Sequence, residues 1–490
     1  MRSSGILMHI SSLPSPWGIG TFGAEAKKFI DFLALSGQRY WQVLPLSPTG
    51  YGNSPYQSFS SYAGNPYFID LDTLNEYGLL ERSEYYEINW GHDHEHTDFG
   101  LLYENRFMVL RKAAQRLLKA DRPEFKDFCK NADFWLDDYA LFMALKDSHG
   151  CDSWTQWERP IRFREENVLN EARQTLSHEI DFYKAVQFLF FWQWSALKSY
   201  AAEKGISIIG DIPIYVAPDS ADVWANPSLF MLDDNLMPIE VAGCPPDNFT
   251  ADGQLWGNPL YDWQEHQKDG YAWWLSRIKH QFKLYDVLRI DHFRGMDEFY
   301  SIPFGSQNAK HGVWREGPGM ELFNAIKNAL GEKQIIAEDL GFLNDSVRKL
   351  LSDSGFPGMK VLQFAFDSRE DSDYLPHNYP SNCVAYVGTH DNNTVVGWFQ
   401  SAPAADVEKA RDYLRIHEGE SVAKASICAL WGSVAELAIV PMQDLLELDD
   451  QARMNTPSTL GSNWQWRMKP NIDLSETSAW LRKITELYGR

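Results

Sequence analysis

Short apolar runs alternate with longer helical patterns along most of the chain. The runs typical of buried strands lie within residues 5–10, 40–44, 206–209, 287–295, 334–341, 359–366, 383–387 and 435–442. Helical patterns lie at residues 24–35, 105–118, 134–146, 181–203, 271–284 and 321–330. Strands that alternate with helices form parallel sheets, so the pattern predicts an α/β fold, a (β/α)8 TIM barrel.

Two of the connections are too long to be simple crossovers. Residues 46–204 follow the second strand, are mostly helical by pattern and are predicted to form an inserted subdomain. Residues 217–270 follow the third strand and are punctuated by Pro, Gly and Trp, which predicts an inserted loop or lid region. The whole chain, residues 1–490, is expected to form a single catalytic domain around the barrel.

Charged residues cluster where the strand within residues 287–295 ends. This segment contains Arg289, Asp291, His292 and Arg294 within a few residues. Charge at the end of a buried parallel strand is costly unless it is paired. A carboxylate between two arginines should stay ionised, which suits a nucleophile better than a proton donor. A structural ion pair at the barrel rim would explain the same pattern.

Three more carboxyl groups follow predicted strands: Asp211, Glu338 and Asp391. In a closed parallel barrel the strand ends share one face, where these groups would meet Asp291. One interpretation is glycosidic bond cleavage with retention, with Asp291 as nucleophile and Glu338, in an apolar setting, as the acid. The other is a magnesium site, although the arginines beside Asp291 would compete with a cation.

The charge and residue content narrow the class of partner. The chain has 45 Lys and Arg against 67 Asp and Glu, a net charge of -22, and no basic block. Nucleic acid and an anionic membrane surface are therefore disfavoured, and an uncharged substrate fits best. The 19 Trp, 22 Tyr and 28 Phe are compatible with sugar binding, although a large core explains most of them.

Several features indicate a cytoplasmic protein. The five cysteines are scattered and contain no Cys-x-x-Cys pair, so neither a disulfide framework nor a cysteine zinc site is indicated. The first residues lack the apolar core of a signal peptide. The most apolar stretch, residues 186–197, is too short to cross a bilayer and is interrupted by Gln187 and Gln193.

Two local motifs match other kinds of site, a dinucleotide-binding loop and a metal site, but the surrounding sequence does not support either. Residues 18–23 match G-x-G-x-x-G, but they lie well beyond the first strand, and the second strand ends in Leu-Pro rather than in a ribose-binding acid. Residues 92–96 read His-Asp-His-Glu-His, with the alternation of a metal ligand set. Flanking polar residues and the absence of a second ligand cluster favour a solvated loop, and no metal or cofactor is expected.

Several segments together resemble the 4-α-glucanotransferase (amylomaltase, or disproportionating enzyme) family of the α-amylase-type glycosidases. They lie, in this order, at residues 54–58 (SPYQS), 211–216 (DIPIYV), 252–259 (DGQLWGNP), 289–295 (RIDHFRG), 337–341 (AEDLG), 388–392 (GTHDN) and 463–467 (NWQWR). The similarity runs from residues 7–14 to the C-terminus. The family lacks the C-terminal β-sandwich of the α-amylases, and this chain likewise leaves little room after its eighth strand.

The resemblance implies roles for individual residues. Asp291 would form a β-linked glucosyl-enzyme, Glu338 would be the general acid/base, and Asp391 would bind the sugar hydroxyls and stabilise the distorted ring. The residues implied to support the same sugar are Asp211, Arg289, His292 and His390. Those implied to line the donor or acceptor groove are Tyr56, Gln254, Trp256 and Asn463.

The resemblance further implies a transferase that disproportionates maltooligosaccharides and α-1,4-glucans such as glycogen or starch. Glucose or a maltooligosaccharide would be the acceptor. An α-amylase-type hydrolase remains the alternative, because water can also resolve a covalent intermediate; loops at residues 245–256 and 455–466 could exclude it. A non-catalytic glucan-binding protein is a third possibility, against which the intact carboxylates argue.

Overall fold

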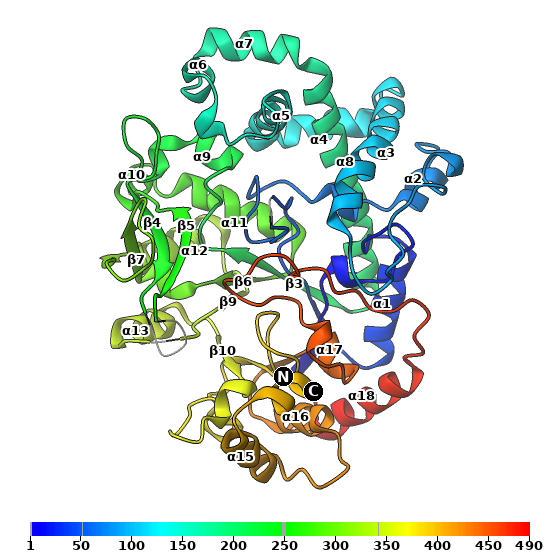
Figure 1. Cartoon of the computed structure of the whole chain (residues 1–490), viewed down its shortest axis with the longest axis vertical. Coiled ribbons are helices and arrows are strands. Elements are labelled where there is room, and N and C mark those ends of the chain that lie inside the picture. Colours follow the sequence, from blue (N-terminus) through cyan, green and yellow to red (C-terminus); the bar gives the residue numbers. More distant parts are fainter. Residues whose placement is uncertain (1, 51, 247–250, 342) are drawn as a thin grey trace.

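Eight parallel strands form the central sheet of the protein, in the order β10-β11-β12-β1-β2-β3-β6-β9. Figure 1 labels β3, β6, β9 and β10 of this sheet. They are β1 (Ser3–Leu7), β2 (Tyr40–Gln42), β3 (Ser207–Pro213), β6 (Val287–Asp291), β9 (Ile335–Ala337), β10 (Gly358–Val361), β11 (Cys383–Tyr386) and β12 (Leu437–Pro441). A hydrogen bond of 3.0 Å from Ala337 N–H to Pro357 O joins the two end strands. The sheet is therefore a nearly closed barrel, as the sequence predicts.

The computed structural model describes residues 2–50, 52–246, 251–341 and 343–490. Residues 247–250, part of the loop expected to act as a lid, lie outside the described residues. Strands β11 and β12 are buried along their whole length, which explains their continuous apolar sequences. The predicted strand at 359–366 is shorter than expected, because residues Leu362–Phe366 form a 3-10 helix.

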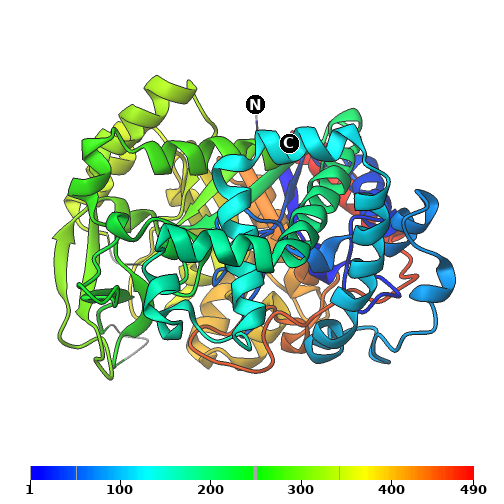
Figure 2. The same cartoon turned by 90° about the horizontal axis from the view of Figure 1, so that it is seen from above.

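Helices cover the outside of the barrel. The helices that follow barrel strands are α1 (Ala24–Leu35), α8 (Ser177–Glu203), α11 (Ala272–Leu284), α12 (Gly319–Leu330), α13 (Asp345–Ser354), α14 (Val395–Ser401), α15 (Ala404–Leu414), α16 (Val422–Gly432), α17 (Met442–Leu445) and α18 (Ser475–Tyr488). The 3-10 helices are η1 (Ile10–Ser12), η2 (Pro66–Phe68), η3 (Arg82–Glu84), η4 (Trp154–Gln156), η5 (Pro227–Leu229), η6 (Phe293–Met296), η7 (Leu362–Phe366), η8 (Pro376–Asn378) and η9 (Asp450–Ala452). Figures 1 and 2 show the two termini close together, and Arg490 Nη1 donates to Ser3 O over 3.0 Å.

Most of the segment between β2 and β3 is helical. Before α8 it contains α2 (Leu71–Glu76), α3 (Phe99–Lys119), α4 (Pro123–Asn131), α5 (Asp133–Ser148), α6 (Arg159–Arg162) and α7 (Glu166–Thr175). Two polar residues of α8, Gln187 and Gln193, interrupt its apolar face for a structural reason. Gln187 pairs through its amide with both backbone groups of Gly64, and Gln193 does the same with Asp70. The long helix therefore fixes the loop that follows β2.

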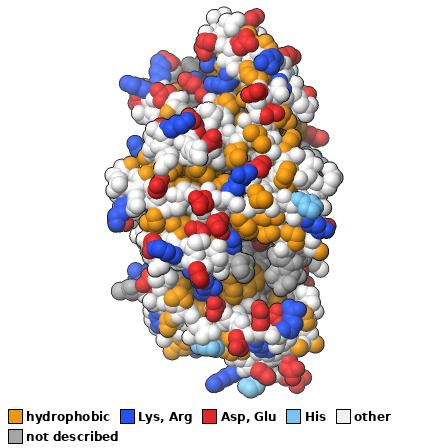
Figure 3. Space-filling model, turned by 90° about the vertical axis from the view of Figure 1, so that its left-hand side faces the viewer, with side chains coloured by type: hydrophobic (Ala, Val, Ile, Leu, Met, Phe, Trp, Pro, Cys, Tyr) orange, Lys and Arg blue, Asp and Glu red, His pale blue; other side chains and the backbone are white. Residues whose placement is uncertain are grey.

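A second, antiparallel sheet stands beside the barrel in the order β5-β4-β7-β8. It consists of β4 (Glu240–Cys244), β5 (Gln254–Pro259), β7 (Glu298–Pro303) and β8 (Val313–Glu316), with α9 (Ala221–Ala225) and α10 (Trp263–Lys268) nearby in the chain. The sequence pattern predicted only a loop or lid over residues 217–270. Val313 and Phe304 are 52% and 51% exposed. Figure 3 shows apolar side chains among charged ones on this side of the molecule.

The glycines of residues 18–23 serve close packing. A Cβ on Gly20 would lie 1.8 Å from Ile10 O, and one on Gly23 would lie 2.3 Å from a carboxylate oxygen of Asp70. Thr21 Oγ1 donates to the same Asp70 over 2.7 Å. The motif therefore packs the loop after β1 against the loop after β2. None of the helices in the described part of the chain has both the length and the apolar character that a membrane crossing requires.

Candidate active site

Asp211, Arg289 and Asp291 form a continuous chain of ion pairs at the carboxyl ends of β3 and β6. Asp211 and Arg289 are partners in the β3–β6 register. Arg289 Nη1 lies 2.5 Å from Asp211 Oδ2, and Nη2 lies 2.8 Å from Asp291 Oδ1. One guanidinium therefore holds two carboxylates, and its planar fork is well suited to this task. Arg294, expected to flank Asp291 as well, pairs with Glu298 across 3.4 Å and covers the Trp314 ring.

The members of this chain differ in exposure. The side chains of Asp211 and Arg289 are 0% and 5% exposed, whereas that of Asp291 is 31% exposed. Burial lowers the pKa of Arg289, but Asp211 and Asp291 outweigh this effect and hold the pKa well above its ordinary value. Burial raises the pKa of Asp211 even though Arg289 opposes the shift. Asp291 is thus the member of the chain that a ligand can reach.

Replacing Arg289 by methionine is expected to destabilise the fold, because it leaves Asp211 buried without its counter-ion. We expect a loss of about 3–5 kcal/mol in the free energy of unfolding at neutral pH. The loss should shrink as the pH falls, since Asp211 can then be protonated and its charge no longer needs a partner. Denaturant titrations at several pH values measure this. An Arg289→Met protein with unchanged stability across that pH range would contradict the prediction.

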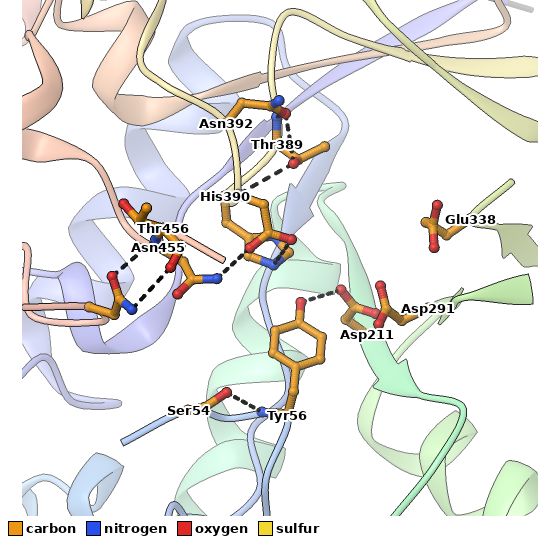
Figure 4. Close-up of polar contacts among 12 residues, drawn as sticks. Ser54, Tyr56, Asp211, Asp291, Glu338, Thr389, His390, Asn392, Asn455 and Thr456 are labelled. Carbon is orange, nitrogen blue, oxygen red and sulfur yellow. Dashed lines mark hydrogen bonds and ion pairs between the residues drawn. The ribbon is translucent and has the colours of Figure 1, made fainter. Parts of the chain in front are cut away.

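Glu338 follows β9 directly and lies beside Asp291. Its Oε2 accepts from His292 N–H and its Oε1 from Leu340 N–H, each over 2.7 Å. Burial and the charge of Asp291 raise the pKa of Glu338 to about 8, against the opposing effects of Arg289 and the two N–H donors. Glu338 therefore keeps its proton at neutral pH. Figure 4 shows it and Asp291 facing the same space from β9 and β6.

His292 connects these two carboxyl groups through its backbone. It adopts the left-handed conformation, with φ 55° and ψ 50°, directly after β6. This turn directs its N–H to Glu338, while its ring lies against Trp256 at a centroid distance of 4.8 Å. Burial lowers the pKa of His292 to about 4, so the imidazole is neutral at physiological pH.

The opposite wall is built from the loop after β11 and from Tyr56. The Tyr56 ring stacks on His390 at 5.2 Å, and its hydroxyl donates to Asp211 Oδ2 over 2.9 Å. His390 Nε2 lies 3.4 Å from Asp391 Oδ2. Tyr56 thus connects the Asp211–Arg289–Asp291 chain to the Asp391 side of the site, and Figure 4 shows it between Asp211 and His390.

The remaining predicted binding residues lie on the surrounding loops and on the small sheet. Gln254 and Trp256 belong to β5, where Trp256 Nε1 donates to Gln254 Oε1 over 3.0 Å. Asn463 is only 8% exposed and is engaged within its own loop, where its Oδ1 accepts from Thr456 N–H over 3.0 Å. Asp211 is 1% exposed and lies behind Tyr56 and Arg289. A sugar contact by Asn463 stays a prediction.

The His92–His96 segment has a structural function in this fold. His96 Nδ1 lies 2.9 Å from Asp93 Oδ2. The backbone of Glu95 accepts from Arg467 N–H over 2.7 Å, and Thr97 N–H donates to Gln465 O over 2.8 Å. The segment therefore supports the loop that ends near Trp466. Across the described residues, no group of three or more His, Cys, Asp or Glu side chains is arranged to hold a metal ion.

Sequence reasoning missed three residues of the site. Trp464 lies 5.9 Å from the Tyr56 ring and 5.8 Å from the His390 ring, measured between centroids. Arg453 and Asn455 bind the loop that carries Asp391. Trp464 and Asn455 lie within residues 455–466, whose polar and aromatic content was the available signal. Arg453 carried no signal, because its partners in the loop after β11, Asp391 and Asn393, lie about 60 residues earlier in the chain.

Comparison with known proteins shows which family this chain belongs to. The family model described as 4-alpha-glucanotransferase matches residues 8–473. The 4-alpha-glucanotransferase of Clostridium butyricum is 49% identical over 485 residues, covering 99% of this chain and 100% of that protein. That of Thermus thermophilus is 45% identical over 500 residues, covering 100% of this chain and 99% of that protein.

Solved structures agree with this match. The structure of an amylomaltase from Streptococcus agalactiae in complex with acarbose superposes with a TM-score of 0.98 at 44% identity, covering 100% of both chains. The amylomaltase from Corynebacterium glutamicum, at 20% identity, has a TM-score of 0.77 and covers 99% of this chain and 74% of that one. The second likeness concerns the fold alone.

Proposed function

This chain belongs to the 4-alpha-glucanotransferase family and has its activity, and we propose that it acts by a retaining double displacement with Asp291 as nucleophile and Glu338 as general acid/base. One observation carries the proposal. Two neighbouring carboxyl groups have opposite surroundings: Asp291 is paired with Arg289, while burial and the charge of Asp291 raise the pKa of Glu338 to about 8. When two neighbouring carboxyl groups have such different surroundings, the one that keeps its proton suits the acid and the one paired with an arginine suits the nucleophile.

In the first step, a carboxylate oxygen of Asp291 attacks the anomeric carbon of the donor glucan. Arg289 holds Oδ1, so Oδ2 is the oxygen we assign to the attack. The glycosidic bond breaks, and Glu338 gives its proton to the departing 4-oxygen, which leaves as the shortened glucan. The products are a β-linked glucosyl ester on Asp291 and an ionised Glu338.

In the second step, the 4-hydroxyl of an acceptor attacks the same anomeric carbon. Glu338 takes the proton of that hydroxyl, the ester bond to Asp291 breaks, and a new α-1,4 bond forms. Glucose or a maltooligosaccharide is the proposed acceptor, and maltooligosaccharides or longer α-1,4-glucans are the proposed donors. The site holds neutral hydrogen-bonding and aromatic groups on the partly exposed Tyr56 and Trp256, which suits an uncharged sugar chain.

Asp391 is proposed to bind the hydroxyls of the sugar at the cleavage point, opposite Asp291 and Glu338. Tyr56, His390 and His292 are proposed to complete the contacts to that sugar. Asp211 acts through Tyr56 and Arg289, to which it is bound. The Trp464 ring is buried beside Tyr56 and His390, so its proposed contribution is to support these two rings from behind.

The test of the proposed function is incubation with maltotriose. Transfer should yield glucose and longer maltodextrins while the number of reducing ends stays nearly constant, because each bond broken is replaced by a new one. Chromatography gives the product lengths, and a reducing-end assay gives the balance. A steep rise in reducing ends would assign hydrolysis instead. Binding of maltodextrin without any change in chain length would assign a non-catalytic binding protein.

The pKa of Glu338 predicts the alkaline limb of the pH profile. The first step needs Glu338 protonated, so kcat/KM should be constant up to about pH 8 and should then fall about tenfold per pH unit. A pH series with maltotriose as donor measures this limb. A limb centred near the ordinary glutamate pKa would contradict the assignment of Glu338 as the acid.

We also propose a cytoplasmic location. All five cysteines are free in the structure, which suits a reducing compartment. Fractionation of the source cells should recover the transferase activity together with cytoplasmic marker enzymes. Recovery with an extracellular or membrane fraction would contradict this proposal.

A further inference from the structure

The Asp391 carboxylate is held by a residue from a different loop. Asp391 follows β11, whereas Asn455 lies after β12 and η9. Asn455 Nδ2 donates to Asp391 Oδ1 over 2.6 Å, and Asn455 N–H donates to His390 O over 3.1 Å. The other carboxylate oxygen, Oδ2, faces His390 Nε2 at 3.4 Å. The orientation of this half-exposed carboxylate is therefore set mainly by Asn455.

Arg453 fixes both loops at the point where they meet. Its Nη2 donates to Asp391 O over 2.6 Å, its Nη1 to Asn393 Oδ1 over 3.1 Å, and its Nε to Asn455 O over 2.9 Å. One guanidinium therefore binds the backbone of Asp391 and the backbone of the residue that orients its side chain. The three N–H donors point in the fixed directions of the planar guanidinium group. A lysine ammonium could not reproduce this arrangement.

The same junction is anchored in the fold by Asp450. Its Oδ2 accepts from Asn393 Nδ2 over 2.5 Å, and its Oδ1 accepts from Thr394 N–H over 2.9 Å. Asp444, in the short helix α17 that follows β12, accepts from Val395 N–H over 2.6 Å. The segment after β12 is therefore hydrogen-bonded to the loop after β11 at several successive positions. Arg453 and Asn455 form the end of this contact that lies nearest the site.

From this arrangement we infer that Arg453 and Asn455 are positioning residues for the transfer reaction and act through Asp391. The inference rests on the proposed function, in which Asp391 binds the sugar at the cleavage point. That interaction is strongest when the ring is distorted in the transition state, so an Asp391 carboxylate that is free to rotate loses transition-state binding more than ground-state binding. The expected loss appears in kcat and leaves KM nearly unchanged.

The test is a double-mutant cycle on kcat with maltotriosyl fluoride as donor. Asn455→Ala should lower kcat roughly 10- to 100-fold in the otherwise unchanged enzyme. In an Asp391→Asn background the same substitution should change kcat less than about twofold, because the carboxylate it serves is already gone. Arg453→Lys keeps the charge but loses the three-way fork, and it should follow the same pattern. Arg453→Lys also carries the test if Asn455→Ala does not fold.

Asn75→Ala is the matched control. Asn75 is a half-buried asparagine in α2 whose Nδ2 makes one hydrogen bond of 2.8 Å to Leu80 O, away from the site. It should leave kcat unchanged in both backgrounds. Equal fold-losses from Asn455→Ala with and without Asp391, or a loss confined to KM, would overturn the inference while leaving the proposed function intact. An unaffected kcat in Asp391→Asn alone would instead refute the proposed role of Asp391.

Discussion

Asp291→Asn is expected to lower kcat for maltotriose disproportionation roughly 10⁴- to 10⁶-fold. The amide cannot form the glucosyl ester, so the two-step path is closed and only substrate binding remains. The substitution keeps the shape of the side chain, and Arg289 retains Asp211 as its partner. KM and the melting temperature should therefore change little compared with kcat. Product formation under saturating maltotriose, followed over hours, measures the loss.

Asp286→Asn is the matched control for this substitution. Asp286 immediately precedes β6, accepts from Ile208 N–H over 2.8 Å and pairs with Lys198 at 3.1 Å, so its carboxylate is structural. Its replacement should leave kcat within about twofold and affect only stability, by roughly 1 kcal/mol. Comparable losses of kcat in the two variants would mean that charge near β6, rather than a nucleophile at Asp291, supports the reaction.

Glu338→Gln should lower kcat for natural glucans by about 10²- to 10⁴-fold, because the departing 4-oxygen no longer receives a proton. With a glucosyl fluoride donor the first step should be largely restored, since fluoride leaves without protonation. The glycosyl-enzyme should then persist, because the acceptor hydroxyl has lost its general base. The alkaline limb of the pH profile near pH 8 should also disappear.

The comparison of donors separates the acid from the nucleophile. Asp291→Asn should stay inactive toward the fluoride donor, whereas Glu338→Gln should release fluoride in a burst. Glu332→Gln, which alters an exposed glutamate paired with Lys327 just before β9, should behave like the unchanged enzyme. If fluoride release were as slow for Glu338→Gln as for Asp291→Asn, Glu338 would not be the acid.

The end of the barrel that holds the candidate active site could be predicted from the sequence because its signal is local. A buried parallel strand has a continuous apolar sequence. A carboxyl group just beyond it is a clear signal, because burying a charge there costs free energy unless the charge is paired. Asp291 and Glu338 each follow such a run, and the structure places them on adjacent strands β6 and β9. Asp391, the fifth residue after the end of β11, lies on the opposite wall beside His390.

Other features depend on contacts between distant parts of the chain and could not be predicted in this way. The sheet of β4, β5, β7 and β8 pairs the segment after β3 with the segment after β6, which lie far apart in the sequence. Its strand β8 is exposed along its whole length, so it does not read as a buried strand. The 3-10 helix after Val361 buries Leu362, Ala365 and Phe366, so its apolar sequence cannot be told from a continuation of the strand. Arg453 and Asn455 act on a loop about 60 residues away. The division of the chain into a barrel with inserted subdomains at 46–204 and 217–270 stays a prediction.

The covalent intermediate offers the most direct test of the whole account. The enzyme would be incubated with an activated 5-fluoro-glucosyl donor, which slows the second step, then digested with pepsin and sequenced by mass spectrometry. The glucosyl label should lie on Asp291 and should be lost when a maltooligosaccharide acceptor is added before digestion. A label on any other residue, or turnover of the donor without a label, would contradict Asp291 as the nucleophile.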